Sequence, residues 1–170
     1  MASITNSLLT LEDSGNGWVK VIVRYTVFQH PLEYWSNTIY NEDIRLIGDD
    51  PPFNPAVPSG TDITVAVFPS YSIRNPHAPD VVPPIFTFER HRVLYVRSES
   101  LNEDPGFTAS GLPLRDEIFA LITLSSVANI PWFPGPFGPF PPGPFPGPGP
   151  LPSPPIPVAT AQTNTVTGHW

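Results

Sequence analysis

Residues 18–28, WVKVIVRYTVF, are the stretch that decides the fold of this chain. Every second side chain from Val19 to Val27 is large and apolar or aromatic. The positions between them hold three polar residues and one apolar residue: Lys20, Ile22, Arg24 and Thr26. Successive side chains of a strand point to opposite faces, so this period of two predicts a β-strand with one buried face.

The residues before this strand carry a hairpin signal. The segment LEDSGNGW contains Asn16-Gly17, a pair that favours the positive φ angles of a two-residue hairpin turn. We therefore predict that residues 7–12 pair with residues 18–28 as a first antiparallel hairpin.

Further strand patterns follow at roughly regular spacing, with turn segments between them and no convincing helical periodicity. They cover residues 36–48, as one long or two short strands, and residues 62–73, 85–98, 116–126 and 158–170. The apolar phase of residues 85–98 breaks at Glu-Arg-His-Arg, residues 89–92, which indicates a β-bulge there. His91 is expected on a solvated face of that strand.

Seven or eight such strands predict an all-β fold. The expected architecture is an antiparallel β-sandwich, immunoglobulin-like in the broad sense, with a jelly roll or small barrel as alternatives. The chain has no cysteine, so the Cys–Trp–Cys arrangement of true immunoglobulin domains is absent. We expect sandwich strands in residues 1–130, a Pro/Phe/Gly-rich arm in residues 131–157, and a final strand in residues 158–170 that returns to the sandwich.

The arm, PWFPGPFGPFPPGPFPGPGPLPSPPIP, is more than half proline, which predicts polyproline II conformation. Glycine does not recur at every third position, so a collagen triple helix is excluded. The strand-like residues after it favour an insertion before the last strand over a C-terminal tail. Large aromatic side chains exposed to water would be a liability. The aromatic residues expected to make inter-subunit contacts are Trp132, Phe133, Phe137, Phe140 and Phe145.

Charge is unevenly distributed along the 170 residues, whose net charge is −7. Every Asp, Glu, Lys and Arg lies at or before Glu117. No basic stripe exists, so nucleic acid is not an expected partner. No apolar run is long enough for a membrane span. The N-terminus lacks the pattern of a secretory signal, so we expect a virion, leaderless export or a cytoplasmic location.

No catalytic motif occurs in the chain, and the four histidines lie in separate segments. We therefore expect no enzymatic activity, no catalytic residue, no cofactor and no metal site. Two weaker interpretations stay open. The acidic loops with Asp49, Asp50, Glu103 and Asp104 could hold calcium. The aromatic residues Tyr34, Trp35 and Tyr71 could form a sugar-binding platform.

These features together predict a non-enzymatic structural subunit of a larger assembly. A virus or phage particle component, or a subunit of an extracellular filament or appendage, would fit. Its partners would be copies of itself or other subunits, contacted through the arm and through edge strands. The alternative is a carbohydrate- or surface-binding β-sandwich module with a glycan as its partner.

Overall fold

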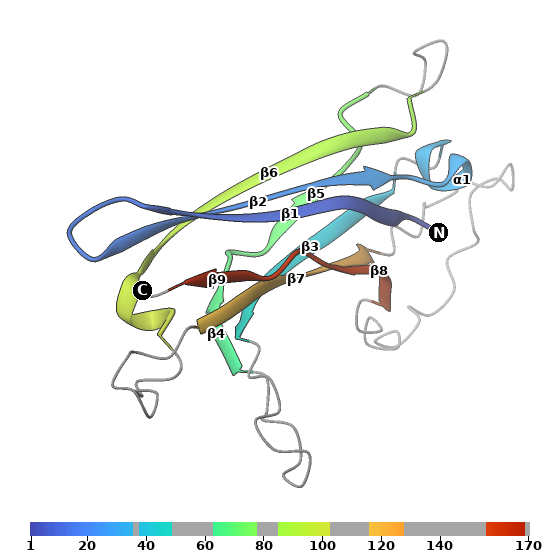
Figure 1. Cartoon of the computed structure of the whole chain (residues 1–170). Coiled ribbons are helices and arrows are strands. Elements are labelled where there is room, and N and C mark those ends of the chain that lie inside the picture. Colours follow the sequence, from blue (N-terminus) through green and yellow to red (C-terminus); the bar gives the residue numbers. More distant parts are fainter. Residues whose placement is uncertain (36–37, 49–62, 78–84, 103–115, 128–155, 169–170) are drawn as a thin grey trace, which may run out of the picture.

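The computed structural model describes residues 1–35, 38–48, 63–77, 85–102, 116–127 and 156–168. In this part the chain is all-β, with antiparallel strands in two sheets and almost no helix, as the sequence predicts (Figure 1). The elements are β1 (Ser3–Asp13), β2 (Trp18–Phe28), α1 (Pro31–Trp35), β3 (Ile39–Gly48), β4 (Ile63–Val67), β5 (Tyr71–Ile73), β6 (Thr87–Arg97), the 3-10 helix η1 (Ser98–Ser100), β7 (Asp116–Val127), β8 (Ile156–Gln162) and β9 (Val166–Gly168).

The first sheet has the strand order β1-β2-β6. β1 and β2 form the predicted hairpin, and their turn is centred on Asn16 and Gly17, with φ angles of 55° and 74°. The Trp18 amide donates to the Gly15 carbonyl at 3.1 Å, which closes this turn. Positive φ at both central residues is what a type I′ turn requires, so the Asn-Gly signal is confirmed.

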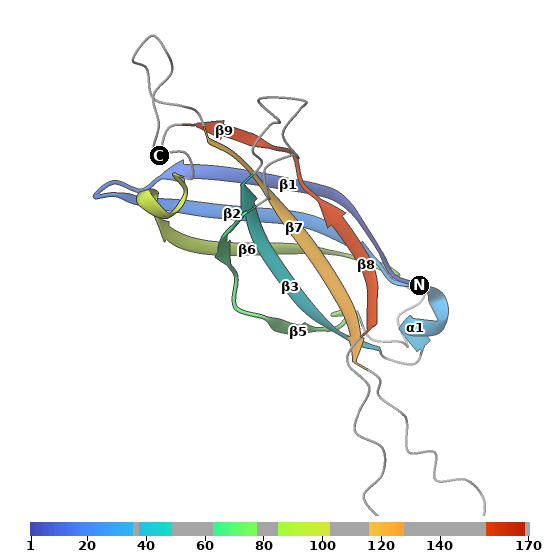
Figure 2. The same cartoon turned by 90° about the horizontal axis from the view of Figure 1, so that it is seen from below.

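The second sheet has the order β4-β3-β7-β8, with β5 also pairing with β3 and β9 with β7. Each of its edges is therefore made of two short strands in succession. Residues 62–73, predicted as one strand, divide into β4 and β5 around Pro69. β8 and β9 both pair with β7, the strand that precedes them in the chain (Figure 2).

One hydrophobic core lies between the two sheets. The first sheet contributes Val21, Val23 and Tyr25, and the second contributes Ile44 and Ile122, all almost completely buried. Fully burying a Val, Leu or Ile side chain stabilises the fold by roughly 1.5–3 kcal/mol. The alternation read from residues 18–28 therefore identifies the inner face of β2 correctly.

The side of the molecule where β1 meets the C-terminal strands is closed by side-chain hydrogen bonds. Asn164, between β8 and β9, contacts the backbone of Leu9, and the Ser7 hydroxyl donates to the Gln162 carbonyl at 2.8 Å. On the opposite side, β6 pairs only with β2 among the described strands. The long outer edge of β6 therefore has no strand neighbour there.

The bulge predicted at residues 89–92 is wrong. β6 pairs with β2 in one unbroken register from Thr87 to Arg97. The apolar phase breaks because Arg90 and Arg92 occupy positions of the inward-facing set that also contains Phe88 and Val96. Two charged side chains therefore point toward the core, where their charges need partners of opposite sign.

Candidate functional sites

Glu42 lies on the inner face of β3 and its side chain is completely buried. A carboxylate in this position would be costly without partners, because burial removes its hydration. Arg90 and Arg92 approach it from β6, and Tyr25 approaches it from β2. These residues, together with Tyr71, are called the charged cluster below.

The contacts of the charged cluster join both sheets. Arg90 Nε lies 3.2 Å from Glu42 Oε1, and Arg92 Nη1 pairs with Glu42 Oε2. The Tyr25 hydroxyl donates to Glu42 Oε1. Arg92 Nη2 also donates to the carbonyl of Pro69 at 2.9 Å, which ties β6 to the segment between β4 and β5.

Tyr71 of β5 covers the two guanidinium groups from outside. Its ring centroid lies 5.8 Å from Arg90 Cζ and 5.4 Å from Arg92 Cζ. Both distances are within the range of a cation–π interaction. The cluster therefore occupies the side of the molecule where β5 and β6 form the edges of the two sheets.

The electrostatics of the cluster indicate a structural role. Burial raises the pKa of Tyr25 to about 12, although the positive charges of Arg90 and Arg92 lower it. The hydroxyl therefore stays protonated and donates to Glu42. Because Glu42 has no solvent exposure and is surrounded by donors, it cannot reach a substrate. The arrangement connects β2, β3, β5 and β6.

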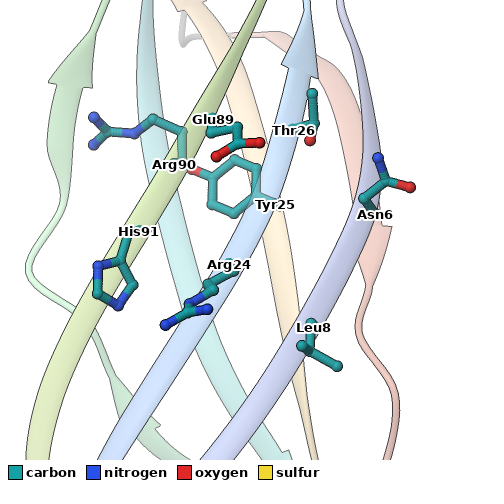
Figure 3. Close-up of a pocket in the computed structure, with 8 residues that line it drawn as sticks. All are labelled: Asn6, Leu8, Arg24, Tyr25, Thr26, Glu89, Arg90 and His91. Atoms are coloured by element: carbon teal, nitrogen blue, oxygen red, sulfur yellow. The ribbon is translucent and has the colours of Figure 1, made fainter.

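A second feature is a hollow of about 490 Å³ on the outer face of the three-stranded sheet (Figure 3). It is lined by Asn6 and Leu8 of β1, Arg24, Tyr25 and Thr26 of β2, and Glu89, Arg90 and His91 of β6. Tyr25 and Arg90 direct their polar groups to Glu42 instead. The remaining polar side chains offer donors and acceptors toward solvent.

The backbone of β1 shapes one wall of this hollow. A register shift between Thr5 and Leu8 places an irregularity opposite β2, and Asn6 there has a φ of 52°. Asparagine tolerates the left-handed region better than most residues. The irregularity therefore sets Asn6 on the same wall as Leu8, opposite a regular β6.

The aromatic residues predicted to make inter-subunit contacts all lie outside the described residues, as do Asp49, Asp50, Glu103 and Asp104. The predicted sugar platform is not assembled as expected, because Tyr34 is buried and packs edge-on against Trp35 and Phe86. Trp35 and Tyr71 are both exposed. The two rings contact different residues: Trp35 packs against Tyr34, whereas Tyr71 lies over Arg90 and Arg92.

His91 is exposed on the outer face, as expected, whereas His30 accepts a hydrogen bond from the Leu32 amide at 3.3 Å. Within the described ranges no three His, Asp or Glu side chains gather in a metal-binding group. None of the described helices is long and apolar enough to span a membrane.

Sequence reasoning missed the charged cluster. The available signal was the presence of Glu42, Arg90 and Arg92 at positions where the alternation calls for apolar residues. Charges of opposite sign in the buried phase of two strands indicate a buried ion pair. The residues that line the hollow give no such signal in the sequence, because they are typical of a solvated strand face.

Comparison with known proteins adds no identification: no family model, no curated protein and no solved structure matches this chain.

Proposed function

We propose that the protein is a non-enzymatic structural subunit of a larger assembly, such as a virus or phage particle or an extracellular filament or appendage. The observation that carries this proposal is the outer edge of β6. This strand is eleven residues long, has an unbroken register with β2 and has no neighbour on its other side in the described part of the chain. Such an edge is a template for a strand of another subunit.

The side chains of β6 suit a selective contact. Val93 and Tyr95 are exposed on the outer face, at 40% and 56%. The inward-pointing arginines limit indiscriminate pairing, because inward charges are one of the devices that protect edge strands. The edge would therefore accept a particular partner strand, namely one from another copy or another subunit.

We further propose that the two sheets form an antiparallel sandwich of the immunoglobulin-like class in the broad sense. The order β1-β2-β6 in one sheet and β3-β7-β8 in the other is consistent with the A-B-E and C-F-G strands of that class. In this assignment residues 131–155 are an insertion before β8, in polyproline II conformation. The predicted arm ends two residues earlier than residue 157, because Ile156 and Pro157 already pair with β7.

The proposed arm would leave the molecule at the end that carries α1. β7 ends at Val127 opposite Ile39, and β8 begins at Ile156 opposite Ser126. Leu32 and Trp35 of α1 are exposed at 74% and 56%. These apolar side chains offer a contact surface for the phenylalanine residues of a neighbouring copy's arm.

The solution mass of the full-length protein tests this proposal, measured by light scattering together with negative-stain images. The native chain is expected to form defined oligomers or fibres. Replacing Phe137, Phe140 and Phe145 by Ser, or Val93 and Tyr95 by Lys, should yield folded particles of lower mass.

A matched control introduces the same two charges at Thr5 and Thr10. Both residues lie on the outer face of β1, away from the β6 edge, and both are exposed. Assembly should survive these changes. A native chain that is monomeric at all concentrations would contradict the proposal, and so would loss of assembly in the control alone.

A further inference from the structure

We propose that the hollow on the outer face of the three-stranded sheet binds a saccharide that carries a carboxylate group. The strand register brings the necessary groups together. Arg24 lies directly opposite His91 of β6 and opposite Leu8 of β1, while Thr26 lies directly opposite Glu89. Three strands thus contribute two adjacent rows of side chains to one concave surface (Figure 3).

The polar groups of the hollow are available to a ligand. The side chains of Asn6, Arg24, Thr26, Glu89 and His91 make no hydrogen bond or ion pair with any other described residue. Converging donors and acceptors with no internal partner are the feature that orients ligands in small-molecule sites. The volume of about 490 Å³ is in the range of such sites, about 300–1,000 Å³.

The first row selects for a carboxylate. A guanidinium presents paired donors that match a carboxylate in planar, bidentate geometry. The imidazole of His91, directly across from Arg24, adds a donor or an acceptor on the same row. Leu8 on the other side of Arg24 is 47% exposed and offers an apolar surface to a sugar ring.

The second row selects for hydroxyl groups. The carboxylate of Glu89, the hydroxyl of Thr26 and the amide of Asn6 can all accept hydrogen bonds, and the last two can also donate. A purely apolar ligand would bury these groups without partners, which is unfavourable. Nucleic acid is disfavoured because a phosphate backbone is held by several Lys or Arg side chains, and in this hollow Arg90 is already paired with Glu42.

Binding in this hollow does not depend on the assembly proposed above, and it can be measured in any oligomeric state of the protein. Saturation-transfer difference NMR observes the free ligand, so protein size does not limit it. The probes are D-glucuronate and N-acetylneuraminic acid, compared with D-glucose and with acetate. We expect saturable transfer to the two acidic sugars and much weaker transfer to glucose and acetate.

Three variants of the full chain locate the site. Arg24→Ala should weaken binding of the acidic sugars by roughly tenfold or more, because it removes a charge-assisted pair. Asn6→Gly tolerates the positive φ while deleting the amide, and should also weaken binding. Lys20→Ala is the matched control, since Lys20 lies on the same strand and face, four residues from Arg24 and outside the hollow.

Each outcome of these binding measurements either supports or overturns the proposed site. Binding of both acidic sugars that is lost in Arg24→Ala and kept in Lys20→Ala supports the site. Absence of transfer to any sugar, equal binding of acetate and glucuronate, or equal loss in both variants overturns the proposal. Circular dichroism and the thermal midpoint establish that each variant is folded. Arg24 is exposed and makes no hydrogen bond or ion pair with a described residue, so it can be replaced without disturbing the core.

Discussion

The side-chain amide of Asn164 forms both hydrogen bonds that a neighbouring strand would offer to Leu9. Its Oδ1 accepts from the Leu9 amide at 2.7 Å, and its Nδ2 donates to the Leu9 carbonyl at 3.3 Å. One side chain thus stands in for a strand at the edge of β1, 155 positions away in the sequence. It links the N-terminal strand to the turn between β8 and β9.

Replacing Asn164 by Ala should therefore lower the free energy of unfolding by about 1–3 kcal/mol, because two backbone groups lose their partner. Asn164→Asp keeps the acceptor for the Leu9 amide but sets a carboxylate oxygen against the Leu9 carbonyl, so it should also be destabilising. Urea denaturation followed by fluorescence measures both. Thr165→Ala, at the exposed next residue, is the control and should change stability by less than about 0.5 kcal/mol. An equal loss of unfolding free energy in Asn164→Ala and Thr165→Ala would contradict a stabilising role for the hydrogen bonds between Asn164 and Leu9.

The charged cluster makes a second prediction. Glu42→Gln removes the only carboxylate that contacts Arg90 and Arg92 in the described part of the chain. Because both arginines are mostly buried, the change should destabilise the fold by about 3 kcal/mol or more. Replacing all three residues by Leu should recover much of this loss, since an apolar core needs no compensating charge.

Asp43→Asn is the matched control for Glu42→Gln. Asp43 is the next residue of β3 and pairs with Arg45 at 3.0 Å, but both partners are well exposed. Removing such a surface pair should cost less than about 1 kcal/mol. If the two substitutions had the same effect in urea denaturation, the buried pair would not be the stabilising feature described here.

Stability should fall in alkali. Burial raises the pKa of Tyr25 from 10.0 to about 12, and burial also raises the pKa of Tyr40. Between about pH 10 and 12 the unfolded chain loses these protons while the folded chain keeps them. Fewer protons are then bound in the unfolded state, so the free energy of unfolding decreases as pH rises. The contribution of Tyr25 is on the order of 2 kcal/mol.

Denaturant midpoints measured at several pH values from 9 to 12 test this dependence. Tyr25→Phe should be less stable at pH 9, because it loses the hydrogen bond to Glu42. It should also show a shallower decline above pH 10. Tyr95→Phe, which removes an exposed hydroxyl, should follow the native curve. A Tyr25→Phe curve parallel to the native one would refute the assignment.

Much of the local structure was predictable from the sequence. The alternation in residues 18–28 and the Asn16-Gly17 pair depend on neighbours within a few positions, and both the strand and its turn are found. The misreading at residues 89–92 has a physical cause. Charged residues normally face solvent, so a break in apolar phase resembles a bulge, whereas here Arg90 and Arg92 stay in phase and pair with Glu42.

The sequence by itself determined that the described part of the chain is built from β-strands and where most of them lie, because strand periodicity and turn chemistry are local properties. Only the tertiary structure decided which strands share a sheet, that Arg92 meets Glu42 across 50 positions, and that side chains of β1, β2 and β6 surround one hollow. Those relationships depend on register and on burial of the whole core. The free energies of strand pairing and of core burial are sums over many residues that lie far apart in the sequence, so no single segment of the chain determines them.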